Sequence, residues 1–401
     1  MLKISVQEAL PPLFLLVNTL TSFNLTWLLL QDFSKNVSLD EMLIVAASYY
    51  ASMIVSSVIG ATLLREKLKE KNTLFHVTLI GAFLYVLSTL FILEKTSPSL
   101  VVVAFILGAP LGVIIPTCLT LFASYSKIEG RGRLGGIVLF LVQFFTVMIY
   151  VLASMLDAAA LLVLAGWRFI SATCMLFYRP FREISKSINA NPMKSVIENR
   201  IFLLYFIPWF MFCLVNFTEI PVLEHFFGEE IFTIYILAVV IIVGVSAFLG
   251  GLICDLKGRR IAGILGFILL GVSYAILNLF PDADMAKLLF INIEGIAWGI
   301  LYVTFIFVVW GDISEGRVRE VYYLLGGFPF LLSGLIQTAT QRFVNAIPIY
   351  ASFSLASFFL FLAVIPLLYA SETLPEKKLR ERELRSYIEK AKRVREKFTK
   401  G

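Results

Sequence analysis

The residues best suited to chemistry are acidic, aromatic and amide side chains inside long apolar segments. Glu294, Trp298 and Tyr302 follow one another at intervals of four, so they would share one face of a helix. A charge within a membrane-spanning helix costs at least about 2.5 kcal/mol, and such residues commonly face a cavity and serve function. Glu294 is therefore the sharpest candidate for binding a solute or exchanging a proton. A structural hydrogen bond between helices is the alternative.

Further polar residues lie in two other apolar segments, at spacings that place them on shared helix faces. Asn18, Ser22 and Thr26 recur at intervals of four, and Asn216 and Glu219 are three residues apart. These residues predict polar surfaces that could hydrogen-bond a solute. Glu219 lies nearer the end of its segment, so a place at the rim or gate is as well supported as a binding role.

Three more polar residues stand singly within apolar segments. Gln143 and Gln337 each bring one amide into a segment, and both are candidate solute contacts. Arg168 lies near the middle of another segment. For Arg168 the sequence favours a structural partner or a lipid contact over solute binding.

The composition indicates the solvent that these segments face. Of the 401 residues, 59% are hydrophobic and 15% are charged, and the mean hydropathy is +0.87. Soluble domains carry about 25% charged residues, so this composition predicts an all-α integral membrane protein. The sequence has no metal-type cysteine or histidine spacing and no phosphate-binding glycine loop. We therefore expect no enzyme activity, no metal and no cofactor.

Twelve apolar runs have about the 20 residues that cross a bilayer core. They are 10–30, 42–64, 73–93, 99–123, 135–156, 158–178, 201–223, 231–253, 261–280, 286–310, 320–341 and 348–370. The runs predict a first bundle over 1–178 and a second over 201–371. A polar central loop at 179–200 joins the bundles, and a charged tail helix follows at 372–401.

Most of the 34 lysines and arginines fall in alternate loops and in the tail, whereas acidic residues dominate several of the other loops. Because lysine and arginine resist translocation, the basic loops and both termini are predicted to be cytoplasmic, in a protein of the plasma membrane. The net charge of +6 then reflects a bias toward one membrane surface rather than nucleic-acid binding. The tail is predicted to rest on membrane lipids or to bind a regulatory partner.

A short motif recurs between the two halves of the chain. Glu-Gly-Arg-Gly-Arg at 129–133 returns as Glu-Gly-Arg-Val-Arg at 315–319, each time before a long apolar run. Internal repeats of this size are typical of secondary transporters.

A second motif lies between two spans of the second half. Gly251, Asp255 and Gly258 are followed by the basic pair Arg259 and Arg260. This spacing resembles the cytoplasmic loop motif of the major facilitator superfamily. The first-half counterpart is degenerate, because a leucine replaces the acid there.

The resemblance implies two pseudo-symmetric six-helix bundles around a central cavity that alternates its access between the membrane sides. The first, fourth, seventh and tenth spans would line that cavity. The residues that would act in the gating loops are Gly251, Asp255, Gly258, Arg259, Arg260, Arg131, Arg133, Arg317 and Arg319.

The sequence thus predicts secondary or facilitated transport of a small organic solute, neutral or cationic, by a monomer. Proton coupling through Glu294 and uniport both remain open. The alternative is a membrane sensor, scaffold or lipid translocator that shares the fold.

Overall fold

The computed structural model describes residues 6–92, 96–156, 159–180, 192–314 and 318–374, and every regular element within these ranges is helical. The first half consists of α1 (Val6–Phe33), α2 (Leu39–Thr62), α3 (Lys71–Ile92), α4 (Ser97–Tyr125), α5 (Arg131–Ser154) and α6 (Ala160–Met175). Short 3₁₀ turns, η1 (Lys67–Lys69) and η2 (Ile128–Gly130), precede α3 and α5.

The second half follows the short helix α7 (Pro192–Ile197). Its long helices are α8 (Arg200–Phe227), α9 (Glu229–Lys257), α10 (Arg259–Leu279) and α11 (Asp284–Tyr302). The last three predicted spans are divided into shorter pieces. They are η4 (Val303–Val308), α12 (Val309–Ile313), α13 (Arg319–Leu331), α14 (Ser333–Thr340), η5 (Val344–Ala346), α15 (Ile349–Leu362) and α16 (Val364–Tyr369).

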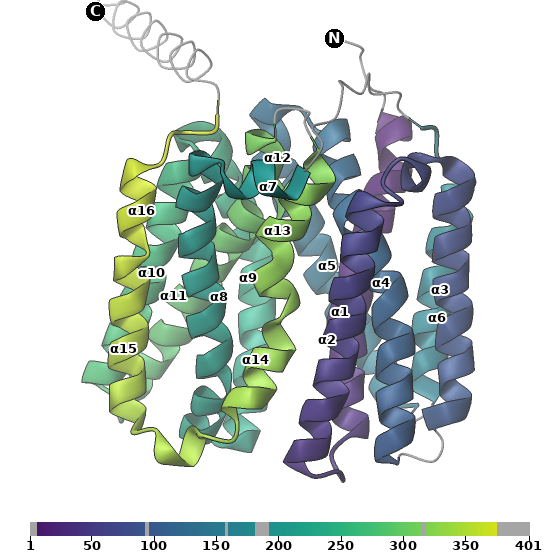
Figure 1. The fold of residues 1–401 in the computed structure, drawn as a ribbon. Coiled ribbons are helices and arrows are strands. Elements are labelled where there is room, and N and C mark those ends of the chain that lie inside the picture. The colour runs from purple at the N-terminus through teal and green to yellow at the C-terminus, as the bar shows by residue number, and fades with distance from the viewer. Residues whose placement is uncertain (1–5, 93–95, 157–158, 181–191, 315–317, 375–401) are drawn as a thin grey trace, which may run out of the picture.

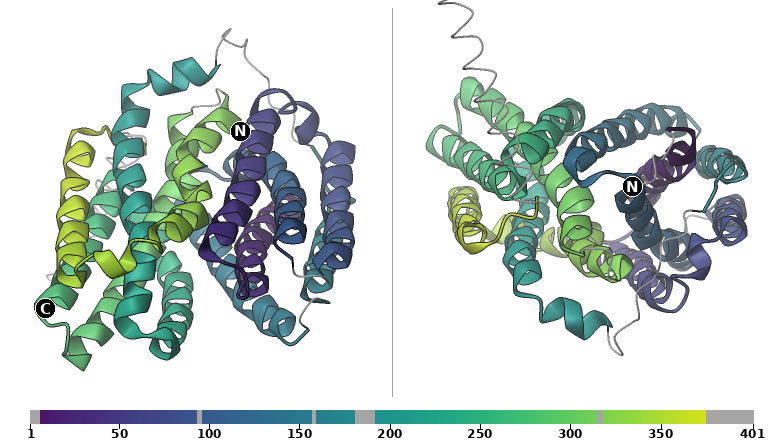
Figure 2. Two further views of the ribbon diagram at one scale, coloured as in Figure 1. Left: turned by 60° about the horizontal axis from the view of Figure 1, so that its bottom comes forward. Right: turned by 90° about the horizontal axis from the view of Figure 1, so that it is seen from above.

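The predicted all-α membrane fold is confirmed, and its twelve-helix count agrees with the structure. Eleven helical segments of the described chain are long and apolar enough to cross a membrane, and α6 is a shorter apolar helix. Figure 1 shows α1 to α6 in one half of the molecule and α8 to α16 in the other, and the views in Figure 2 agree with this division. The predicted tail helix lies mainly in 375–401, outside the described residues.

Capping residues and glycines mark the ends of several helices. Ser38 begins α2 with a capping box, in which its hydroxyl accepts from the N–H of Glu41 and the Glu41 carboxylate accepts from the N–H of Ser38. Gly228 and Gly258 separate consecutive long helices with φ of +76° and +107°, values that suit glycine. The π-helical turn η4 interrupts the tenth predicted span, a feature that often marks functional sites.

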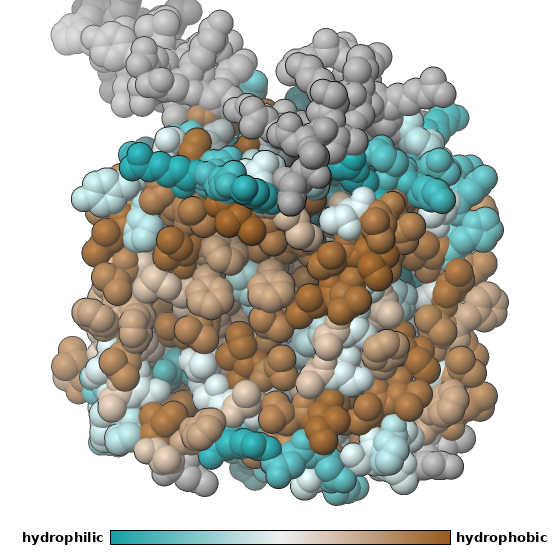
Figure 3. Space-filling view, in the orientation of Figure 1, coloured by the Kyte–Doolittle hydropathy of each residue, from teal (hydrophilic) through white to brown (hydrophobic). Residues whose placement is uncertain are grey.

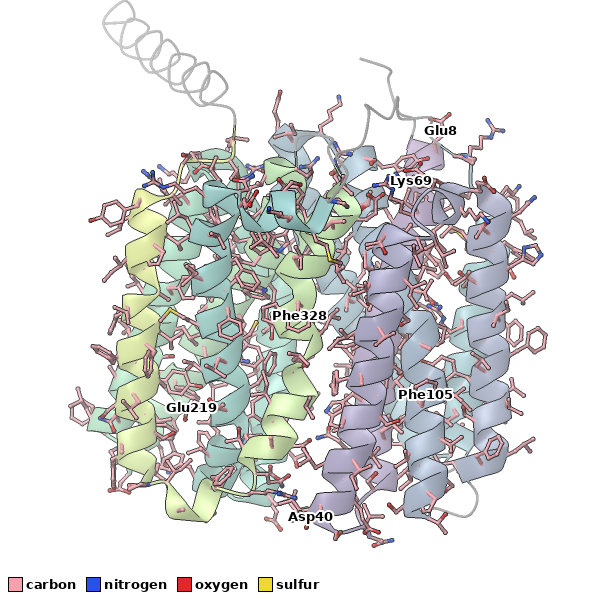
Figure 4. All side chains as sticks on the ribbon, viewed as in Figure 1. Glu8, Asp40, Lys69, Phe105, Glu219 and Phe328 are labelled. Carbon is pink, nitrogen blue, oxygen red and sulfur yellow. The ribbon has the colours of Figure 1, made fainter. Side chains whose placement is uncertain are left out.

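The outer surface carries apolar side chains around the middle of the molecule. Figure 3 shows this apolar belt between two hydrophilic rims, as expected for a chain solvated by lipid. Figure 4 places Glu8 and Lys69 at one end of the helices and Asp40 at the other. We call these ends the basic end, with Lys69, and the opposite end, with Asp40. The sequence predicts that the basic end is cytoplasmic.

Candidate functional site

A small apolar cavity lies between the two halves. Leu20 and Phe23 of α1, with Ile115 and Leu119 of α4, line it on the side of the first half. Its volume is about 20 Å³, which is room for about one water molecule. The two halves are therefore closed on each other at this level.

Aromatic rings form the wall on the side of the second half. The ring of Trp209 in α8 is stacked on Phe305 of η4, with centroids 5.1 Å apart and planes 9° apart. The ring centroid of Phe330 in α13 lies 6.4 Å from that of Trp209 and 5.7 Å from that of Phe23, so Phe330 contacts the first half. Trp310 of α12 also lines the cavity.

Contacts between the halves close the path from the cavity to the opposite end. The hydroxyl oxygen of Tyr50 in α2 accepts a hydrogen bond from the backbone N–H of Gly334 in α14, at 3.1 Å. The indole of Trp27 in α1 also packs directly on Gly334, where a larger residue would have no room. An ion pair joins Arg342 to Asp40 at the surface.

At the basic end, a buried carboxylate joins both halves. Asp312 of α12 forms an ion pair with Arg131 of α5 and receives a hydrogen bond from Nε of Arg259 at 2.8 Å. Arg259 also donates across the interface from Nη2 to the backbone oxygen of Ile128, at 2.5 Å. All three charged side chains are almost fully buried, so each depends on the others for compensation.

Asp255 makes a second connection beside the first. Its carboxylate accepts from the backbone N–H groups of Gly132 and Arg133, at 2.9 and 3.0 Å, and from Nε of Arg133 at 3.1 Å. An acid of α9 thus caps the N-terminus of α5 in the other half. The backbones of Gly132 and Gly251 approach so closely that a β-carbon at either position would collide with the facing chain.

The remaining motif residues tie α10 to the end of α16. Gly258 precedes α10 and leaves space for the carboxylate of Glu372. That carboxylate accepts from the backbone N–H groups of Arg259 and Arg260, at 2.8 and 3.1 Å. The guanidinium of Arg260 donates to the backbone oxygen of Ala370 at 3.3 Å.

Two further contacts cross the interface at this end. Lys69 of η1 forms a 2.8 Å ion pair with the buried carboxylate of Glu320 in α13. Nη1 of Arg319 donates to the hydroxyl of Ser124 at 2.9 Å. Arg317, the other predicted gate residue of this loop, lies outside the described residues.

Sequence reasoning missed Asp312, the partner of Arg131 and Arg259, and also the ion pair of Lys69 with Glu320. Both acids lie at the ends of apolar runs, where a charged residue is unremarkable by spacing alone. The available signal was that Arg131 has no acid at helical spacing and Arg259 has only Asp255, so buried arginines there need acids from other elements.

The polar face of α1 meets other helices of its own half. Nδ2 of Asn18 donates to the backbone oxygen of Trp167 in α6 at 2.7 Å, and the Ser22 hydroxyl donates to the backbone oxygen of Asn18. The hydroxyls of Thr26 and Tyr85 in α3 are 2.5 Å apart. These groups are therefore engaged away from the cavity lining.

Arg168 lies fully buried among these helices. Its Nη1 donates to Oδ1 of Asn18 and to the hydroxyl of Thr19, both at 3.2 Å. Its Nε and Nη2 have no hydrogen-bond partner among the described residues, and Nη2 lies beside Gly81 of α3. The ion pairs found in the described chain include none to this guanidinium.

The two candidate acids of the second half lie within that bundle. One carboxylate oxygen of Glu294 accepts from the hydroxyl of Tyr235 in α9 at 2.6 Å, and the other has no partner among the described residues. Glu219 accepts from Ser352 of α15 at 2.6 Å. The hydroxyl of Tyr274 in α10 is also buried in this bundle, and it has no hydrogen-bond partner among the described residues.

The remaining candidates occupy varied positions. Asn216 is buried, and neither amide atom has a partner among the described residues. Tyr302 lies 5.6 Å from Trp298 and 5.5 Å from Phe330, so it connects the Glu294 face to the cavity wall. Gln143 and Gln337 are half-buried. None of these five candidates belongs to the cavity lining, although Phe330, which Tyr302 contacts, does.

Solved structures share this architecture. The human organic anion transporter MFSD10 (TETRAN) is 12% identical, with a TM-score of 0.68 over 90% of this chain and 99% of its own. A variant of the E. coli fucose:proton symporter FucP is 12% identical, with a TM-score of 0.69 over 91% and 98%. The proton:xylose symporter XylE is 14% identical, with a TM-score of 0.63 over 91% and 96%. At these identities the likeness concerns the fold.

Sequence comparison is decisive at the level of the family. No curated protein matches this chain in sequence. The sequence pattern of the Major Facilitator Superfamily, a family of solute transporters rather than enzymes, matches residues 13–319. Because that match covers most of the chain, the protein is a multi-pass membrane protein that belongs to the Major Facilitator Superfamily.

Proposed function

We propose that this protein carries a small organic solute across the membrane by alternating access. The observation that carries the proposal is the cavity between the halves, with separate contacts closing the way to each end. Contacts between the halves on both sides of a central site fit alternating access, in which the halves rock about that site and open one end at a time. We further propose that the protein works as a monomer in the plasma membrane with both termini cytoplasmic.

The contacts at the basic end are suited to act as a gate. They join charged side chains of one half to charged side chains and helix ends of the other. When the halves separate, each charged group is therefore exposed to water instead of being left buried without a partner. Water then replaces the lost hydrogen bonds, and the free-energy difference between closed and open states stays modest. Asp255 and Arg133 form part of this gate, together with Arg131, Arg259 and Arg319.

The opposite end closes by other means. Tyr50 and Trp27 pack against Gly334, which is possible because that residue has no side chain. The Arg342–Asp40 ion pair at the same end is exposed. Exposed ion pairs contribute about 0–1 kcal/mol, so this pair opposes opening only slightly. Opening of this end therefore depends chiefly on parting Tyr50 and Trp27 from α14.

We propose that Glu294 couples transport to a proton. Its side chain is fully buried, and one carboxylate oxygen lacks a partner, so loss or gain of a proton would change its contact with Tyr235. Tyr302 lies on the same face of α11 as Glu294, about two turns away, and its ring contacts Phe330 of the cavity wall. We propose Glu219 and Asn216 as further members of this site.

Transport can be tested with a cleavable cross-link that locks one end. Cysteines replacing Asp40 and Arg342 would be joined across the halves by a bis-methanethiosulfonate reagent, which spans the gap that the arginine side chain fills. We expect cross-linking to lower solute counterflow in proteoliposomes at least tenfold, and reductant to restore it. A matched pair replacing Asp32 and Tyr150, which contact each other within the first half, should have no such effect. Counterflow that is unchanged by the lock would contradict alternating access.

The counterflow assay should be run with a panel of solutes of different chemical classes. Hexoses, amino acids, dicarboxylates, lipophilic cations and uncharged aromatic compounds should be compared with and without a pH gradient. If none of them moves and the lock changes nothing, the membrane sensor, scaffold or lipid translocator becomes the better description. A strong preference for dianions would contradict the predicted neutral or cationic solute.

A further inference from the structure

We infer that the solute is uncharged and largely apolar, with an aromatic-sized body and at least one hydrogen-bond acceptor. This inference names the substrate class of the central cavity and rests on the proposed transport function. It differs from the sequence-based expectation, in which polar and acidic residues line the cavity.

The surfaces that meet between the halves become the cavity walls when the halves part. On the first half, the surface that faces the cavity is aliphatic and aromatic, as Leu20, Phe23 and Leu119 show. On the second half five of the eight lining residues are aromatic, and Ile306, Gly327 and Leu331 complete the surface. Tyr323 is the one hydroxyl on the lining, and it is already donated to the backbone oxygen of Phe307 at 2.8 Å. A solute that enters this space therefore meets apolar surface on both sides.

The charged side chains of the membrane interior and the amides of Asn18 and Asn216 lie outside the cavity lining. Asn18 and Arg168 bond to each other within the first half, and Glu294 bonds to Tyr235 within the second. No ionisable side chain of the described residues belongs to the cavity lining apart from that tyrosine. An ion in this cavity would give up its hydration without a counter-charge, which disfavours charged solutes strongly.

Two residues of the cavity lining carry an indole N–H that is buried and unpaired among the described residues. Trp209 and Trp310 both line the cavity, both are fully buried, and neither Nε1 has a hydrogen-bond partner among the described residues. An indole N–H is only a donor, so its complement is an acceptor such as a carbonyl or ether oxygen. Buried donors are normally satisfied, and a solute acceptor would satisfy one here.

The ring arrangement favours a flat solute. The parallel rings of Trp209 and Phe305, with Phe330 tilted by 28° from Trp209, present flat faces and edges within one wall. Aromatic pairs of this kind contribute about 0.5–1.5 kcal/mol beyond their buried area. A planar ring system of the solute can extend this stack when Phe330 moves away with the opening halves.

Three naphthalenes with one ring system test the class. Acetylnaphthalene is uncharged with an acceptor, ethylnaphthalene lacks the acceptor, and naphthoate carries a negative charge. Binding is measured by equilibrium dialysis against the protein in nanodiscs, with empty nanodiscs as the background. We expect acetylnaphthalene to bind about fivefold more tightly than ethylnaphthalene, as one hydrogen bond predicts, and at least tenfold more tightly than naphthoate.

Two substitutions locate the acceptor contact. Trp209→Phe and Trp310→Phe keep a ring and remove the N–H, and at least one should abolish the preference for acetylnaphthalene over ethylnaphthalene. Trp167→Phe, in the first half and outside the lining, is the matched control and should keep it. Preference for naphthoate, or a preference that survives in both cavity variants, would overturn the inference.

The same preparation separates this inference from the transport proposal. If a hexose or a dicarboxylate binds and shows lock-sensitive counterflow while the naphthalenes bind no better than to empty nanodiscs, the substrate class is wrong and transport stands. If acetylnaphthalene binds in the expected order but neither it nor any other solute shows counterflow, the class of ligand stands and transport fails.

Discussion

Asp255 near the end of α9 accepts hydrogen bonds from both the backbone N–H and the Nε–H of Arg133, which stands at the start of α5 in the other half. The Asp255 carboxylate therefore caps the N-terminus of a helix that lies 122 residues away in the sequence. Because the cap is lost when the halves part, its strength sets part of the balance between closed and open states at the basic end.

Asp255→Asn should favour opening of the basic end. An amide keeps the size of the side chain but loses the charge that interacts with the α5 N-terminus and with Arg133. N-cap contacts contribute about 0.5–2 kcal/mol, so we expect the open-to-closed ratio to rise about tenfold. The measurement is thiol labelling of a cysteine that replaces Leu119 in the cavity wall. Asp282→Asn, an exposed acid near the start of α11, is the control, and equal labelling rates in both variants would refute the role of Asp255.

Removing Asp312 should cost more stability than removing either arginine. Asp312→Ala removes the carboxylate that Arg131 and Arg259 share and leaves both arginines buried, whereas Arg131→Met leaves Asp312 paired with Arg259. We expect a loss of about 3–5 kcal/mol in the free energy of unfolding for Asp312→Ala. Denaturation in mixed micelles measures both variants. A larger loss for Arg131→Met would show that the shared carboxylate is not the centre of the cluster.

Arg168→Met is predicted to stabilise the protein if the arginine serves no function. The guanidinium is fully buried, and two of its nitrogen atoms have no partner among the described residues, so an apolar side chain of similar length avoids a cost. Replacing buried charges in this way has stabilised other proteins by about 1–4 kcal/mol. The melting temperature and solute counterflow should be measured together. Lower stability of the methionine variant than of Arg168→Lys would mean that the cation is compensated after all.

Gly334→Val should hold the opposite end open. The added side chain would occupy the space where Tyr50 and Trp27 pack against α14, so closure there would be blocked. The expected result is thiol labelling of an Ala339→Cys or Phe330→Cys variant from that side, at a rate at least tenfold above the parent. Gly166→Ala, which has open space around it, should leave the rate unchanged. Unchanged labelling in Gly334→Val would contradict the assigned closure.

Glu294→Gln should separate solute binding from proton coupling. The amide preserves a hydrogen bond with Tyr235 but cannot carry the proton, so we expect counterflow to persist while accumulation driven by a pH gradient is lost. Glu224→Gln, an acid near the end of α8, is the control. Gradient-driven accumulation that survives in Glu294→Gln would rule out this carboxyl as the coupling group.

The sequence was sufficient for the helices but not for the directions in which their polar faces point. Exposing backbone polar groups to lipid is costly, so a segment that crosses the bilayer forms a long apolar helix. The twelve apolar runs could therefore be identified from the sequence alone. Periodicity places Asn18 and Ser22 on one face of α1, yet it does not say which neighbour that face meets. In the structure that neighbour is α6 of the same half.

The gate shows the same limit. Spacing identified Asp255 with Arg259 and Arg260, since all three lie in one short motif. It did not identify Asp312, because the need for this acid arises only when Arg131 of one half and Arg259 of the other meet in space. The aromatic cavity wall was missed for a similar reason, since phenylalanine is common throughout the chain and apolar rings carry no spacing signal that separates cavity from lipid.

The most direct test of alternating access is a pair of distance distributions between spin labels. One pair replaces Lys127 and Lys257 at the basic end, and the other replaces Asn36 and Gln341 at the opposite end, all exposed positions. Across pH and solute conditions, we predict that one distance lengthens while the other stays short, and that Gly334→Val and Asp255→Asn bias the two ends in opposite senses. A single unchanging distance at both ends under all conditions would contradict the account.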